Sequence, residues 1–201
     1  MVNKFIFNRK KKNTIVLIHG LYTTSGFWLS YFKLFKNFRI IAFDINYDKL
    51  LKSDYSINFL NDTFSVDGDI VGVISHSFGT VISDLVFDQN YEMIYKICPV
   101  AFSKRLESSN FVFDIVNKTI LSEESINNNI KLVRSYLLKV KSSLSYSGQI
   151  YIPNMDCYFS YEIPQKKKIE FYGDHFNISF ALENIIEELS SCNLLHDYKV
   201  R

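Results

Sequence analysis

The 201-residue sequence contains little glycine, proline or cysteine, with 7 Gly, 3 Pro and 3 Cys. So few glycines and prolines exclude collagen-like and low-complexity chains. The three cysteines, Cys98, Cys157 and Cys192, are odd in number and show no Cys-x-x-Cys spacing. The sequence therefore indicates neither a disulfide framework nor a zinc site. A net charge of +2 does not favour disorder, and 47% hydrophobic residues are enough to build a core.

Long apolar segments are also missing from the sequence. No window approaches the ~18 uninterrupted apolar residues of a membrane span, and the apolar run at residues 5–7 is too short for the core of a signal peptide. We therefore expect one domain, residues 1–201, in the cytoplasm. Nearly balanced charge gives no reason to expect a nucleic-acid partner. The sequence contains no phosphate-binding glycine loop and no metal-ligand spacing, so neither a cofactor nor a metal is expected.

Short β-branched and apolar runs recur along the chain, which is typical of strands buried on both faces. Together with the run at 5–7, we predict strands at residues 14–18, 39–43, 70–74, 94–98, 149–152 and 168–172. Helical spacing predicts helices at residues 25–36 and 80–88, and a C-terminal helix on which Leu182, Ile185, Ile186 and Leu189 share one face. This alternation predicts an α/β fold with a mostly parallel central sheet flanked by helices.

One region, residues 103–147, breaks the alternation. It contains no run typical of a buried strand. Instead, Ile126, Ile130, Val133 and Leu137 mark one amphipathic helix, and the apolar residues of segment 111–116 indicate another. Because the region is far longer than an ordinary connecting loop, we predict a small helical lid inserted into the domain.

The strongest chemical signal is the segment Ser75-His76-Ser77-Phe78-Gly79, at the predicted junction of a buried strand and a helix. A turn this sharp brings two backbones nearly into contact, so small residues are needed two positions before and after the central serine. Gly79 satisfies the second position, and Ser75 keeps a small side chain at the first. The segment resembles the G-x-S-x-G nucleophile elbow of the α/β-hydrolases, with Ser77 as the nucleophile.

A second segment, His19-Gly20-Leu21, directly follows the predicted strand at 14–18. It is similar to the oxyanion loop of the same superfamily. In that loop, backbone N–H groups stabilise the negative charge that develops on the carbonyl oxygen of an acyl substrate. The resemblance assigns these N–H groups to Leu21 and Phe78, and it gives His19 a structural role in fixing the loop.

The third segment, Gly173-Asp174-His175-Phe176, lies between the last predicted strand and the C-terminal helix. It resembles the segment in which α/β-hydrolases often carry their catalytic histidine. A serine hydroxyl needs an imidazole to accept its proton at neutral pH. Of the four histidines, His175 alone directly follows a strand near the end of the chain, so it is the candidate base.

The acid of the triad should lie between the serine and the histidine, because the α/β-hydrolase order is serine, acid, histidine. Asp156 follows the predicted strand at 149–152 and is the first candidate. Glu162 is the alternative if the strand lies at 157–160, although this leaves few residues for a parallel crossover. Glu107 and Asp114 are more remote options.

The resemblance to the α/β-hydrolase superfamily covers about residues 3–190. It implies a serine esterase or thioesterase that cleaves a small carboxylic ester or thioester through an acyl-enzyme on Ser77. Two alternatives stay open. One is an acyltransferase, cyclase or lyase that uses the same triad, and the other is a non-catalytic binding member of the fold.

The lysine clusters at 10–12 and 166–168 allow two interpretations. They are most simply solvated loop charges. Together with Lys131, Arg134, Lys139 and Lys141, they would instead form a basic rim for an acidic acyl-carrier protein or coenzyme A. Most aromatic residues are expected to pack in the core and lid, and Phe111 and Phe113 are candidates for lining an acyl pocket.

Overall fold

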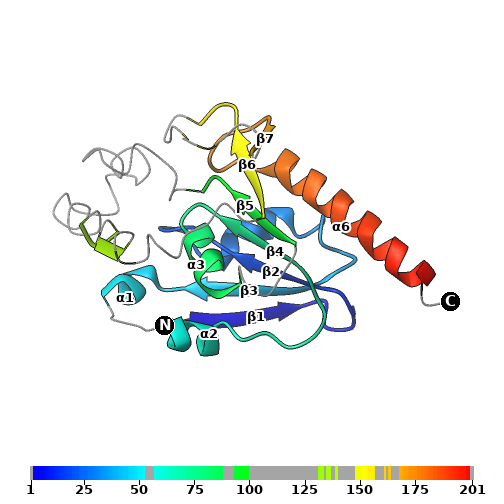
Figure 1. Ribbon diagram of the computed structural model, residues 1–201, viewed down its shortest axis with the longest axis horizontal. Helices are drawn as coiled ribbons and strands as arrows, with labels where there is room; N and C mark the ends of the chain where they lie inside the picture. Colours follow the sequence, from blue (N-terminus) through cyan, green and yellow to red (C-terminus); the bar gives the residue numbers. More distant parts are fainter. Residues whose placement is uncertain are drawn as a thin grey trace.

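A mostly parallel β-sheet forms the centre of the computed structural model. The structure describes residues 2–52, 57–87, 93–99, 148–156 and 168–199, together with residues 131–133, 135, 136, 139, 161 and 163. Within them, seven strands pair in the order β1-β3-β2-β4-β5-β6-β7. They are β1 (Val2–Phe7), β2 (Thr14–Ile18), β3 (Arg39–Ile45), β4 (Ile70–His76), β5 (Ile94–Ile97), β6 (Gln149–Pro153) and β7 (Lys168–Phe171). Only the β1–β3 pair is antiparallel (Figure 1). The predicted α/β architecture is confirmed.

The register of the parallel strands brings their carboxyl ends to one edge of the sheet. Ile18 at the end of β2 lies opposite Ser75 of β4. His76, the last residue of β4, lies opposite Ile97 of β5. The segments that follow these strands therefore meet at the same edge, where open α/β sheets bind their ligands.

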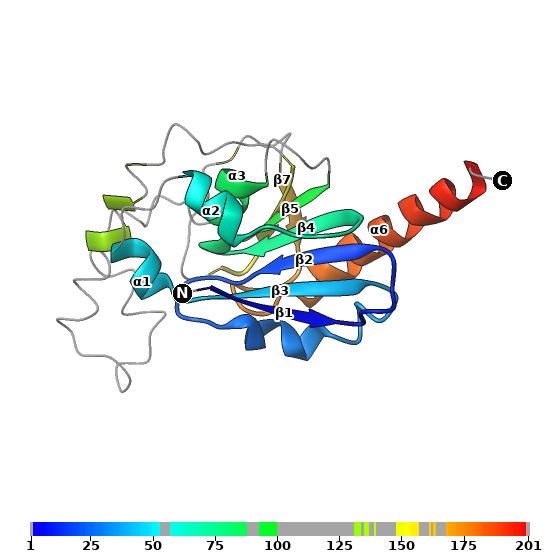
Figure 2. The same cartoon turned by 90° about the horizontal axis from the view of Figure 1, so that it is seen from below.

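Helices cover both faces of the sheet (Figure 2). One face carries α1 (Tyr47–Lys52), α2 (Ile57–Thr63) and α3 (Gly79–Val86), and the other carries the 3₁₀ helix η1 (Ser25–Tyr31) and α6 (Ser179–Lys199). Strand side chains alternate between these two layers, as the period of two requires. In β2, Val16 and Ile18 pack toward α3, while Ile15 and Leu17 pack toward α6. Strands buried on both faces explain the nearly unbroken apolar runs in the sequence.

The segment predicted as a helix over 25–36 differs in the structure. The 3₁₀ helix ends at Tyr31 and is followed by turns as far as residue 37. Backbone N–H groups donate to carbonyls three residues earlier, at Leu34 to Tyr31 and Phe35 to Phe32. Both a 3₁₀ helix and an α-helix bring residues three apart onto one side, so apolar spacing did not distinguish them. The short helices α1 and α2, of six and seven residues, were not predicted, because one or two turns show little periodicity.

The proposed lid, residues 103–147, lies largely outside the described residues. Within it, residues 131–133, 135, 136 and 139 are helical, and Val133 is buried in the core layer that also contains side chains of α1 and α3. The lid therefore stays a prediction. None of the helices in the described part of the chain is long and apolar enough to cross a membrane.

A buried ion pair lies between the sheet and α3. The ammonium of Lys96 on β5 faces the carboxylate of Asp84 on α3, and both side chains are almost completely inaccessible to solvent. Removing two charges from water is costly, and mutual attraction offsets that cost only while both partners are present. The pair therefore fixes α3 against β5.

Replacing Asp84 by Asn is expected to lower the free energy of unfolding by about 3 kcal/mol or more, because it removes the carboxylate facing a buried ammonium. Asp48→Asn is the matched control. Asp48 pairs with Lys52 on the exposed side of α1, and its replacement should change stability by less than about 1 kcal/mol. Chemical denaturation measures both variants, and equally small losses would contradict this assignment.

Candidate active site

Ser77 occupies the sharp turn between β4 and α3. Its φ is +54°, a left-handed conformation that costs a non-glycine residue of order 1–3 kcal/mol and persists only where surrounding structure enforces it. The N–H of Ser77 donates to the carbonyl of Ile97 at 2.9 Å, which ties the turn to β5. The side chain of Ser77 is thereby held at the carboxyl edge of the sheet.

Two glycines allow the turn to touch the loop after β2. A Cβ at Gly79 would lie 2.5 Å from the carbonyl oxygen of His19 and 2.7 Å from that of Ile18. A Cβ at Gly20 would lie 2.7 Å from the Cβ of Ser77. Neither position has room for a side chain, so the close backbone approach itself requires both glycines.

Ser75 stands where the elbow pattern has its first glycine. Its side chain is fully buried. The hydroxyl donates to the carbonyl of Tyr95 at 3.2 Å and lies 3.0 Å from the Oγ of Ser83. Because a buried hydroxyl is tolerated when it has hydrogen-bond partners, this departure from the pattern leaves the turn intact.

The structure brings Ser77, His175 and Asp156 together. The Nε2 of His175 lies 3.0 Å from the Oγ of Ser77, and its Nδ1 lies 3.1 Å from Oδ2 of Asp156. A carboxylate only accepts hydrogen bonds, so Nδ1 carries the proton and Nε2 is left to accept from the serine hydroxyl. The other acid candidates, Glu162, Glu107 and Asp114, lie outside the described residues.

Backbone contacts join the loop of the acid to the loop of the histidine. The N–H of Met155 donates to the carbonyl of Gly173 at 3.1 Å, and the N–H of Gly173 donates to Oδ1 of Asn154 at 3.2 Å. Asp174 caps its own turn by accepting from the N–H of Phe176 at 2.7 Å. The two loops are thus held in register with each other, as the carboxylate–imidazole contact requires.

His76, next to the nucleophile, supports the loop of His175. Its Nε2 donates to the backbone carbonyl of His175 at 2.7 Å, and its ring stacks on Phe27 with centroids 4.6 Å apart. Burial, followed by the neighbouring charge of His175, lowers the pKa of His76 to about 3. His76 is therefore neutral near pH 7 and serves as a fixed donor, a role that the sequence pattern did not predict.

His19 fixes the loop after β2. Its Nε2 accepts from the N–H of Ile45 at 2.9 Å, so the proton resides on Nδ1, which donates to the carbonyl of Gly20 at 2.8 Å. Burial lowers the pKa of His19 and keeps it neutral. The hydroxyl of Tyr47 donates to the carbonyl of His19. These bonds leave His19 no free nitrogen for proton transfer.

The predicted oxyanion hole consists of the backbone N–H groups of Leu21 and Phe78. In the part of the chain that the structure describes, neither N–H has an assigned hydrogen bond. Their use as an oxyanion hole stays a prediction. The ring of Phe78 packs between Tyr47 and Tyr136, with centroids 5.4 and 6.1 Å away, and this packing fixes the backbone that carries one of the two donors.

Tyr161 contacts the site although the sequence analysis did not single it out. Its hydroxyl donates to Oδ2 of Asp156 at 2.5 Å and lies 3.5 Å from Nδ1 of His175. Burial raises the pKa of Tyr161 well above its ordinary value, so the hydroxyl keeps its proton. No local motif surrounds this tyrosine, and only the tertiary contact reveals it.

Three potential metal ligands also gather here. Among the described residues, His76, Cys98 and His175 place ligand atoms within 4.8 Å of one another. Both nitrogens of His175 are engaged by Ser77 and Asp156, and Nε2 of His76 donates to a carbonyl. A metal ion would reach His175 only by displacing these hydrogen bonds, so the hydrogen-bond network accounts for the cluster.

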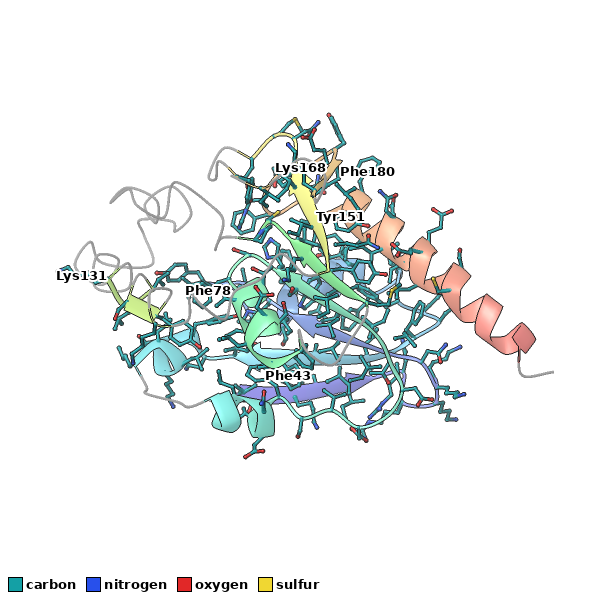
Figure 3. All side chains as sticks on the ribbon, in the orientation of Figure 1. Phe43, Phe78, Lys131, Tyr151, Lys168 and Phe180 are labelled. Atoms are coloured by element: carbon teal, nitrogen blue, oxygen red, sulfur yellow. The ribbon has the colours of Figure 1, made fainter. Side chains whose placement is uncertain are left out.

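The described lysines of the predicted basic rim do not share one surface. The lysines at 10–12 lie in the turn before β2, at the amino edge of the parallel strands and thus opposite the site. Figure 3 shows Lys131 and Lys168 well apart, on different sides of the molecule. Lys168 also pairs with Glu170 at 2.7 Å. Residues 134, 141, 166 and 167 lie outside the described residues.

The chain was compared with protein families, curated proteins and solved structures, and the solved structures identify its fold. No protein-family model and no curated protein matches the sequence. Among solved structures, a lipase-esterase related protein from Clostridium acetobutylicum ATCC 824 has a TM-score of 0.58 at 15% identity, covering 95% of this chain and 99% of its own. An alpha/beta hydrolase fold protein from Burkholderia ambifaria has 0.57 at 14%, covering 94% and 93%. The enol-lactonase from Burkholderia xenovorans LB400 has 0.54 at 10%, covering 94% and 95%. The chain has the α/β-hydrolase fold, as its sequence resemblance predicted.

Gly79→Ala is expected to destabilise the protein by about 1–3 kcal/mol, because the new Cβ would push α3 away from the carbonyl of His19. Gly26→Ala is the control. Gly26 is exposed, and a Cβ added there would meet only the side chains of Thr24 and Leu29. Chemical denaturation compares the two variants, and equal stability would contradict the close approach.

His76 also predicts a pH dependence of stability. Its pKa is about 3 in the folded protein against 6.5 when unperturbed. Between these two values the unfolded chain binds a proton at His76, whereas the folded protein does not. The contribution of neutral His76 to the free energy of unfolding is fully present above pH 6.5. It falls on acidification towards pH 3, with a slope of up to about 1.4 kcal/mol per pH unit.

His76→Gln keeps a side-chain N–H donor but does not titrate, so it should flatten this slope relative to wild type. The lowered pKa of His19 acts in the same direction in both proteins and cancels in the comparison. Denaturant unfolding measured across this pH range provides the test. Identical slopes in the two proteins would refute the assignment.

Proposed function

We propose that the protein is a serine hydrolase that cleaves a carboxylic ester or thioester through an acyl-enzyme on Ser77. One observation carries this proposal. The Oγ of Ser77, the imidazole of His175 and the carboxylate of Asp156 form a continuous hydrogen-bonded series, with distances of 3.0 and 3.1 Å. An imidazole needs this arrangement to take a proton from serine while a carboxylate orients the ring.

In the first half-reaction, the Oγ of Ser77 attacks the acyl carbonyl carbon while Nε2 of His175 takes the hydroxyl proton. The carbonyl oxygen gains the negative charge and accepts hydrogen bonds from the N–H groups of Leu21 and Phe78. The imidazolium then returns its proton to the departing alkoxide or thiolate. An alcohol or thiol leaves, and Ser77 remains acylated.

The second half-reaction repeats these steps with water. His175 takes a proton from the attacking water molecule, and the hydroxide adds to the acyl carbon. Collapse of the oxyanion expels the Oγ of Ser77, which recovers its proton from the imidazolium. The side chains of His175 and Asp156 are each only 2% exposed, so the carboxylate stabilises the transient imidazolium more strongly than it would in water.

The lid forms part of the proposal. Val133 is buried in the core on the α3 side, and Tyr136 contacts the ring of Phe78. Residues from the predicted insertion thus pack next to the turn that carries Ser77. We propose that residues 103–147 cover the site and shape the acyl pocket, and that small acyl groups, carried on an alcohol, coenzyme A or an acyl-carrier protein, are the substrates.

A fluorophosphonate probe is expected to label the wild-type protein and to lose its target in Ser77→Ala and His175→Ala, because phosphonylation needs an activated serine. Asp156→Asn should lower kcat by about four orders of magnitude if it acts as such acids do elsewhere. Ser191→Ala is the matched control. Ser191 lies exposed on α6, and its loss should leave labelling unchanged.

Esters and coenzyme A thioesters of graded acyl length then define the substrate by initial rates. Acyl transfer is separated from hydrolysis by identifying the product in the presence of an added alcohol. A folded wild-type protein that takes up no probe and releases no acid from any of these compounds would overturn the proposal.

A further inference from the structure

Two hydrogen-bond donors converge on one oxygen of Asp156. Oδ2 accepts from the hydroxyl of Tyr161 at 2.5 Å and from Nδ1 of His175 at 3.1 Å. The two donors are themselves 3.5 Å apart. Because both groups are donors, they do not hydrogen-bond to each other. Both donate to the same carboxylate oxygen. The direction of that oxygen therefore sets the direction of the imidazole.

The hydroxyl of Tyr161 helps to satisfy the charge of this carboxylate. The side chain of Asp156 is 2% exposed, so water contributes little to satisfying its charge. Burying a carboxylate destabilises the folded protein unless hydrogen-bond donors surround it, and each missing hydrogen bond adds to that cost. A phenol hydroxyl is a strong donor to an anion, and burial keeps Tyr161 protonated by raising its pKa.

The side chain of Cys98 also contacts the hydroxyl of Tyr161. Its side chain is hydrogen-bonded to Tyr161, and burial raises the pKa of its thiol well above the ordinary value. The phenol oxygen therefore contacts the carboxylate of Asp156 and the thiol of Cys98 together. The N–H of Cys98 in turn donates to the carbonyl of Tyr151 at 3.0 Å. The ends of β5 and β6 thus anchor this hydrogen-bonded chain.

We propose that Tyr161 is a positioning residue of the triad, which orients the carboxylate of Asp156 toward His175 and shares its negative charge. This inference rests on the proposed function, because it concerns the same site. Tyr161 acts through Asp156 and does not touch the reacting atoms. By drawing charge away from Oδ2, it weakens the attraction of the carboxylate for an imidazolium.

Other titratable groups face this pair from each described element around it. His76 approaches from the end of β4 and is neutral near pH 7, with a pKa of about 3. Cys98, at the end of β5, keeps its proton. Asp174 lies in the same loop as His175, with a carboxylate oxygen that accepts backbone N–H groups. The hydroxyl of Tyr161 is a neutral donor, and it reaches the carboxylate of Asp156 directly.

Tyr161→Phe tests the proposal, because it removes one hydroxyl and keeps the ring. We expect kcat to fall about tenfold, the equivalent of one hydrogen bond in the transition state. We also expect the acidic limb of the kcat/KM profile to move to higher pH by about half to one unit, since an unshared carboxylate favours the imidazolium. A merely structural role would lower activity without moving that limb.

Tyr172→Phe is the matched control. Tyr172 is 62% exposed, and its ring packs edge-on against that of Phe180. Loss of its hydroxyl should therefore leave both rate and pH profile unchanged. Folding of each variant is checked by near-ultraviolet circular dichroism.

Nuclear magnetic resonance titration of the His175 imidazole separates this inference from the proposed function, because it needs no turnover. A titration midpoint that rises in Tyr161→Phe supports the positioning role even if every tested substrate proves wrong. An unchanged midpoint together with an unchanged acidic limb overturns it. An inactive wild type with a shifted midpoint would refute the hydrolase proposal and leave the positioning of Asp156 standing.

Discussion

The close approach between the turn after β4 and the loop after β2 is the constraint on which the site depends. Gly79 has no Cβ, and α3 can therefore begin against the carbonyls of Ile18 and His19. That contact forces Ser77 into its left-handed conformation and brings the N–H groups of Leu21 and Phe78 to the same edge of the sheet. Strain at one residue is offset by packing and hydrogen bonds over two strands and a helix.

Three histidines lie at this edge, and their surroundings decide the role of each. His19 and His76 are buried among backbone carbonyls and apolar rings, so their lowered pKa values keep them neutral and make them fixed donors. His175 faces a carboxylate on one side and a hydroxyl on the other. A proton taken up on His175 has a counter-charge within 3.1 Å, which a proton on His19 or His76 would lack at that distance. An imidazole is thus structural at two of these positions, and the third is the one that we propose to move a proton.

The likeness to solved α/β-hydrolases, at 10–15% identity, shows the fold of the chain. It does not show which reaction the site catalyses. This scaffold supports many reactions, because function depends on side chains at the ends of its strands. Here the first elbow glycine is replaced by Ser75, whose hydroxyl is satisfied within the fold. The geometry around Ser77, with a histidine and a buried carboxylate in series, therefore supports the hydrolase proposal more directly than the likeness does.

Local patterns in the sequence predicted the strands of the sheet and the tight turn at Ser77, and the resemblance to α/β-hydrolases then singled out His175 and Asp156. Apolar runs reveal strands buried on both faces, and small residues reveal a tight turn. Three features needed the folded structure: the 3₁₀ form of η1, the separation of the described lysines, and the contact of Tyr161 with Asp156. Spacing of residues three apart fits two kinds of helix, and no local rule states where a loop lysine will point. The hydroxyl of Tyr161 reaches the carboxylate of Asp156 only in the folded chain. The packing that brings these groups together is a property of the whole fold.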